Sequence, residues 1–120
     1  ELIRLGYVAQ DDLPRLYSAA SALAYVSFYE GFGMPVVEAM ASGTAVLTSD
    51  RTSMPEVAGG CAELVNPEDS DDILSGLRRL LEDELYRQSL VDAGRNHSMR
   101  YTWEHSAAQL YQALASLSEA

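Results

Sequence analysis

Four short apolar runs that do not alternate with polar residues set the strongest limit on how this chain can fold. They cover residues 2–5, 23–26, 45–48 and 62–65. A strand with apolar side chains at consecutive positions is buried on both faces, as strands of parallel sheets are. Helix-like segments separate the runs, so strand–helix–strand units with right-handed crossovers follow. The sequence therefore predicts an α/β fold built on a parallel sheet with flanking helices.

The segments between and after these runs carry helix signals. Asp12 is suited to cap one helix start, and Gly43 is suited to close a helix end. The second half of the chain repeats apolar residues at helical spacing. The resulting layered arrangement is Rossmann-like. Helices are expected over residues 12–20, 35–42, 70–81, 84–95 and 103–117, the fourth interrupted near Gly94.

Composition excludes several classes of protein. The net charge is -10, and all 8 basic residues are Arg, so nucleic acid is not an expected partner. Cys61 is the single cysteine, which leaves no internal disulfide and no cysteine metal cluster, and we expect no metal or other cofactor. No apolar run approaches the length of a membrane span, and a cytoplasmic location is expected. Because the chain begins at Glu1, we expect it to be part of a longer protein.

The candidate chemistry lies in residues 27–40, between the second apolar run and the helix after it. In parallel sheets, ligands bind at this carboxyl end of the strands. Gly31 and Gly33 let the chain turn tightly and let a ligand approach the backbone amides. Pro35 suits the first helical position, and Met34 before it has no side-chain oxygen to cap the helix. The first amides of the helix are therefore expected to bind water, or an anionic or hydroxyl-rich ligand.

Two acids flank this turn. Glu30 precedes it, Glu38 lies one turn into the helix, and both are expected to face one pocket, where carboxylates would accept from sugar hydroxyls. Each acid alone has a plainer interpretation, since Glu38 complements the helix dipole and Glu30 fits an ordinary loop. A pair of carboxylates also serves as the catalytic residues of a glycoside hydrolase. The glycine-rich turn and the helix start between them favour binding of a nucleotide sugar instead.

Residues 30–35 (EGFGMP) and 38–43 (EAMASG) resemble the signature of retaining glycosyltransferases of family 4. These are the group 1 glycosyl transferases, which have the two-domain GT-B fold. The likeness covers nearly the whole chain. It implies that residues 1–120 are a partial C-terminal donor-binding domain, without the N-terminal acceptor domain and without the first strand–helix units of their own domain.

The resemblance also implies a role for each motif residue. The donor would be a nucleoside diphosphate sugar, transferred with retention of configuration and without a metal. Glu30 would hold hydroxyls of the donor sugar, and Glu38 would accept both ribose hydroxyls. The remaining donor-binding positions are Gly31, Phe32, Gly33 and Met34, whose backbone would meet the sugar and the diphosphate, and Val37, which would pack beside the ribose.

The absent parts have consequences. The acceptor, a glycan, lipid or small molecule, would bind through the missing domain. The parent enzyme is expected to be cytoplasmic, with peripheral membrane association left open. The family's donor-phosphate Arg and Lys lie outside this chain, so catalysis by these residues alone is not expected. Loss of the neighbouring strand would expose the edge of residues 23–26 and favour self-association. The alternative from another class is a non-catalytic Rossmann-like binding or scaffold module.

Overall fold

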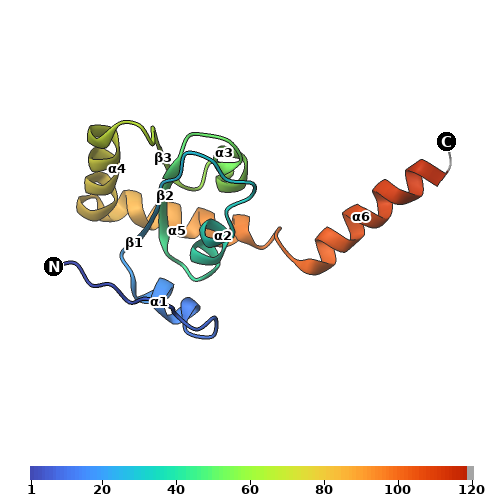
Figure 1. Ribbon diagram of the computed structural model, residues 1–120, viewed down its shortest axis with the longest axis horizontal. Helices are drawn as coiled ribbons and strands as arrows, with labels where there is room; N and C mark the ends of the chain where they lie inside the picture. Colours follow the sequence, from blue (N-terminus) through green and yellow to red (C-terminus); the bar gives the residue numbers. More distant parts are fainter. Residues whose placement is uncertain (119–120) are drawn as a thin grey trace.

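The computed structural model describes residues 1–118, in which a three-stranded parallel sheet lies among helices (Figure 1). The strands stand in the order β1-β2-β3, and both pairings are parallel. The α/β prediction is therefore confirmed. In chain order the elements are α1 (Leu13–Ala19), β1 (Ala22–Tyr25), α2 (Met34–Ala41), β2 (Ala45–Ser49), α3 (Met54–Ala58), β3 (Glu63–Val65), α4 (Ser70–Glu82), α5 (Glu84–Ser98) and α6 (Trp103–Ser118).

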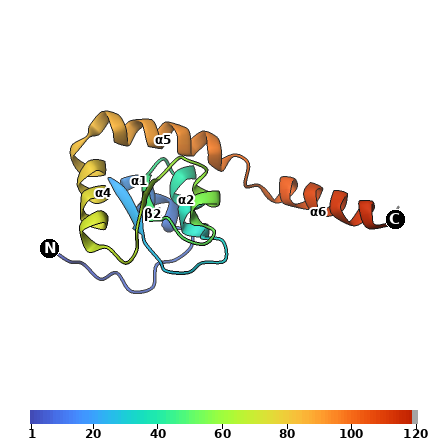
Figure 2. The ribbon, with the colours of Figure 1, turned by 90° about the horizontal axis from the view of Figure 1, so that it is seen from above.

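Strand β2 is the centre of the structure. All five of its residues are buried, and successive side chains enter different clusters. Val46 joins the apolar cluster formed with α2 and α3, whereas Leu47 joins the cluster formed with α4 and α5. Figure 2 shows α4 and α2 on opposite sides of β2. Burial on both faces explains why this strand reads as an unbroken apolar run in the sequence.

The first apolar run does not form a strand. Residues 1–9 contain no regular element, and Leu2 and Ile3 are 83% and 70% exposed. A strand needs a neighbour to take its backbone hydrogen bonds, and within residues 1–118 this segment has none. In the same range β1 pairs only with β2, so its outer edge is unpaired. Self-association through that edge stays a prediction.

Helix α5 shows why a glycine in a helix does not always interrupt it. The predicted break near Gly94 was wrong, because the helix continues to Ser98. Gly94 is buried, and a Cβ at this position would lie only 3.0 Å from Cγ of Met40 in α2. The glycine therefore permits close packing of the two helices rather than ending one of them.

Helix α6 extends away from the body of the protein (Figures 1 and 2). Its start and its length agree with the helix predicted over 103–117. Its apolar residues are largely exposed, with Trp103 at 88% and Tyr111 at 75%. In the part of the chain that the structure describes, no helix combines the length and apolar character needed to cross a membrane.

Candidate functional site

The glycine-rich turn connects β1 to the start of α2. Gly33 occupies the N-cap with φ 92° and ψ 53°, a left-handed conformation that favours glycine. Helix α2 begins at Met34, one residue earlier than predicted, and no side chain caps it. The amide of Val36 donates to the carbonyl of Gly33 at 3.0 Å, so this amide is not free as the sequence predicted. The helix start remains uncapped by side chains, and because Pro35 has no N–H and Val36 is bonded, the amide of Met34 is the one that the first three helical positions leave for a ligand.

Gly33 is also fixed by its surroundings. It is buried, and a Cβ built on it would overlap the methyl group of Met54 and lie 3.0 Å from the sulfur. Met54 is fully buried at the start of α3. The left-handed backbone angle therefore favours glycine here, and a side chain at this position would also displace the buried end of Met54.

A tyrosine of β1 holds Glu30. The hydroxyl of Tyr25 donates to Oε1 of Glu30 at 2.7 Å, and both residues are half-buried. The pKa of Tyr25 is raised, first because its hydroxyl is bonded to this carboxylate and then because it is partly desolvated. The Tyr25 hydroxyl thus remains a donor, and within residues 1–118 no protein group donates to the other carboxylate oxygen of Glu30, which can therefore face a ligand.

A second tyrosine holds Glu38. The hydroxyl of Tyr17 in α1 donates to Oε2 of Glu38 at 3.3 Å. Burial first, and the Glu38 carboxylate second, raise the pKa of Tyr17. Glu38 and Tyr17 line a cavity of about 480 Å³ between α1 and α2, together with Gln10 and Pro14. Glu38 is therefore half-buried at the wall of a hollow large enough for part of a nucleotide.

The two acids have separate phenol partners, and Glu30 does not line the cavity that Glu38 lines, so the expectation that both face one pocket is not met there. The neighbouring Tyr17 contributes to the raised pKa of Tyr25, and these residues sit in consecutive elements, α1 and β1. Neither tyrosine was singled out as a site residue from the sequence, because a tyrosine near the end of a helix or strand carries no spacing signal. The acids themselves were identified by their position around the glycines.

The apolar motif residues line a different hollow. Phe32, Met34 and Val37 border a cavity of about 310 Å³ with Tyr101 and Trp103. The Phe32 ring meets the Tyr101 ring edge to face, with centroids 5.5 Å apart. Val37 is only 7% exposed and belongs to the core cluster on the α2 side of the sheet. Its predicted place beside a ribose stays a prediction.

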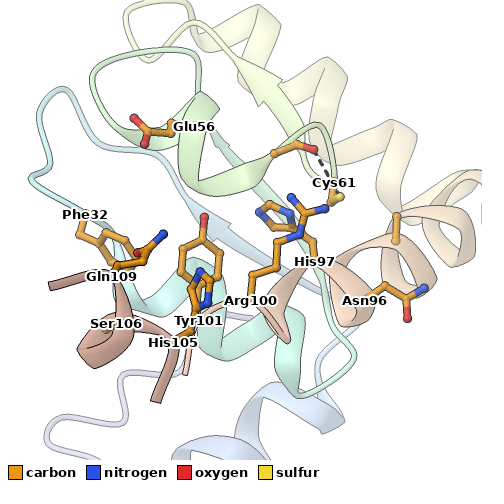
Figure 3. A pocket seen from close by; sticks show the side chains of 12 residues that line it. Phe32, Glu56, Cys61, Asn96, His97, Arg100, Tyr101, His105, Ser106 and Gln109 are labelled. Atoms are coloured by element: carbon orange, nitrogen blue, oxygen red, sulfur yellow. Dashed lines mark hydrogen bonds between the residues drawn. The ribbon is translucent and has the colours of Figure 1, made fainter. Parts of the chain in front are cut away.

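Phe32 also reaches the edge of a larger cavity of about 750 Å³ (Figure 3). This cavity lies between α3, α5 and the start of α6, and Glu56, His97, Arg100 and Tyr101 line it. The pKa of Tyr101 is raised by burial first and by Glu56 second, while Arg100 opposes the shift.

Within residues 1–118, no three metal-binding side chains gather at one place. Whether the protein uses a metal stays a prediction.

A glycine-rich turn between a parallel strand and an uncapped helix, with a carboxylate on each side, defines an α/β domain of the kind that binds nucleotides or sugars. Comparison with known proteins makes this more specific. The model of the family described as "Glycosyl transferases group 1" matches residues 1–97. The chain belongs to this glycosyltransferase family.

Curated relatives and a solved structure agree with that assignment. The chain is 40% identical over 109 residues to the O-antigen chain mannosyltransferase B of Escherichia coli, covering 91% of this chain and 29% of that protein. It is 39% identical over 106 residues to the MMP alpha-(1->4)-mannosyltransferase of Mycolicibacterium hassiacum, covering 85% and 26% respectively.

The fold matches that of sucrose-phosphate synthase from Thermosynechococcus elongatus with a TM-score of 0.78 and 31% identity. The match covers 94% of this chain and 29% of that enzyme, a GT-B glycosyltransferase. The chain thus spans less than a third of the length of these proteins.

Proposed function

We propose that this chain binds a nucleoside diphosphate sugar as the greater part of the donor-binding half of a retaining glycosyltransferase. The observation that carries the proposal is the uncapped start of α2, with Glu38 at the wall of a hollow one turn further on. The free amide of Met34 at the helix start suits a diphosphate or sugar oxygen, and a carboxylate suits vicinal hydroxyls. Glu30, whose carboxylate Tyr25 holds, would accept from hydroxyls of the donor sugar.

The whole protein would transfer the sugar to a glycan, lipid or small-molecule acceptor bound outside these residues. Two relatives are mannosyltransferases by name, so mannose is the first sugar to test on guanosine, uridine and adenosine diphosphates. The roles of Gly31, Phe32 and Met34 as backbone partners of the donor belong to the same proposal. So do a mechanism without a metal and the need for the rest of the protein in catalysis.

Replacing Glu38 by alanine in the whole protein is expected to weaken donor binding about 30-fold. The change removes a charged acceptor, and a hydrogen bond to a charged group is worth about 1.5–3 kcal/mol. Isothermal titration with the nucleoside diphosphate sugar measures the affinity. Glu82→Ala is the matched control, because this glutamate is exposed at the end of α4 and should leave the affinity unchanged. An affinity for Glu38→Ala within twofold of the wild type would show that Glu38 does not bind the ribose.

The open edge of β1 leads to a second expectation for the 120-residue chain, which we propose pairs with another copy of itself. Backbone donors and acceptors along this edge have no partner strand within residues 1–118. Sedimentation at tens of micromolar should reveal dimers or larger species, and Ala24→Pro should reduce them because proline cannot donate to a ladder. A single monomeric species in the wild-type chain at this concentration contradicts the expectation.

A further inference from the structure

The loop after β2 grips the glycine-rich turn from the neighbouring strand. The backbone amide of Glu30 donates to Oγ1 of Thr52 at 3.2 Å. The hydroxyl of Ser53 donates to the carbonyl of Glu30 at 2.9 Å and lies 3.4 Å from the carbonyl of Phe32. Two consecutive hydroxyls therefore hold Glu30 by both its backbone donor and its backbone acceptor.

Ser53 holds the turn and does not cap α3. It occupies the N-cap position of that helix, where a serine side chain ordinarily accepts a hydrogen bond from the first turn. Here it makes no such bond, and its hydroxyl points to the turn after β1 instead. Helix α3 therefore has no side-chain cap, and Ser53 instead links two loops that are 23 residues apart in the sequence.

Thr52 is held in an unfavourable backbone conformation. Its φ is 52°, and among residues 1–118 it is the only residue other than glycine with a positive φ. This region is costly for a β-branched side chain, and such residues persist where surrounding contacts impose them. The Glu30 amide is the contact that its hydroxyl makes.

We propose that Thr52 and Ser53 are positioning residues that fix the Glu30 turn in the shape that receives the donor. Tyr25 holds the carboxylate of Glu30, and the two hydroxyls hold its backbone, so every polar group of this residue is oriented from β1 or from the loop after β2. The inference rests on the proposed donor-binding function. It adds two residues outside the glycine-rich motif on which that function depends.

The test uses the whole protein with two variants, Thr52→Val and Ser53→Ala. Valine matches threonine in shape and branching, so it removes the acceptor and leaves the backbone strain. We expect each variant to raise the KM for the nucleoside diphosphate sugar about three- to tenfold, the range that one net hydrogen bond represents. The KM for the acceptor and the thermal midpoint should stay near the wild-type values, and Thr52→Ser should restore the donor KM.

A second readout does not depend on the donor. In the ligand-free protein, Thr52→Val should shift the amide resonance of Glu30 and speed its exchange with water about three- to tenfold. The control is Ser89→Ala, which removes an exposed helix hydroxyl bonded to the Tyr86 carbonyl and should change neither the resonance nor the KM.

The outcomes separate the two proposals. If the wild type binds donor but both variants leave the donor KM unchanged, the positioning role is overturned, whatever happens to the Glu30 amide. If the variants lower the thermal midpoint and leave the donor KM unchanged, the hydroxyls are only structural. If the wild type binds no nucleoside diphosphate sugar while the Glu30 amide still responds, the contact is real, but the donor-binding function and the role built on it both fail.

Discussion

Replacing Gly33 by alanine is expected to lower the free energy of unfolding by about 3 kcal/mol and to remove measurable donor binding. The loss of stability has two separate causes. A left-handed backbone costs an L-residue about 1–2 kcal/mol, and Gly33 has φ 92°. Overpacking a closed core costs a further 1–3 kcal/mol or so, and the added Cβ would overlap the buried Met54 side chain. Because the turn and the start of α2 shift together, the donor amides leave their positions.

Urea denaturation followed by circular dichroism measures the first effect, and donor titration measures the second. Gly31→Ala is the matched control for the stability measurement. It lies two residues away in the same turn, its φ is not positive, and no atom lies within 4 Å of a Cβ built there. That variant should stay within about 0.5 kcal/mol of the wild type. Equal stability of the two alanine variants would mean that the turn does not depend on the Gly33 conformation.

The sequence identified the elements whose signals are local. Consecutive apolar residues mark β2 because both faces of this strand are buried, and helical spacing marks α4 because one side of it packs on the sheet. The segment 2–5 has the same apolar character, yet it forms no strand, since pairing depends on a neighbour and not on the segment itself. A strand signal is therefore necessary but not sufficient.

The candidate site divides in the same way. The glycines and the flanking acids are close together in sequence, so their pattern could be recognised. Three of the residues that orient them could not be, because Tyr17, Thr52 and Ser53 reach the motif across 21 to 23 residues. Ser53 illustrates this, because a serine before a helix predicts an N-cap. In the structure its hydroxyl donates instead to the carbonyl of Glu30, which is distant in the sequence.

Leu47 and Gly76 show how closely the sheet and α4 are matched. Leu47 is fully buried in β2. A Cβ on Gly76 in α4 would lie 2.6 Å from Cδ1 of Leu47 and 2.8 Å from Cγ1 of Val65. Glycine in a helix costs about 1 kcal/mol relative to alanine, and here that cost is offset by the close approach of the helix to the sheet. The effects of substitutions at Leu47 and Gly76 on stability are therefore expected to depend on one another, because both side chains would occupy the same space.

Leu47→Ala is accordingly expected to lower the free energy of unfolding by about 3 kcal/mol, through lost apolar burial and the cavity left behind. Gly76→Ala alone should cost about 1 kcal/mol, because the clash exceeds the gain in helix propensity. In the double variant the Leu47 methyl is gone and the new Cβ fills part of the cavity. The combined loss should therefore be about 1 kcal/mol smaller than the sum of the single losses.

Urea denaturation of the four proteins in this cycle measures the coupling, and Leu85→Ala is the matched leucine control because Leu85 is 84% exposed. The control should change the unfolding free energy by less than about 0.5 kcal/mol. Strict additivity of Leu47→Ala and Gly76→Ala would mean that α4 does not rest on β2 at this point. The close packing of α4 on β2 matters for the site as well. Strand β2 also pairs with β1, and the loop that follows β2 supplies Thr52 and Ser53 to the glycine-rich turn.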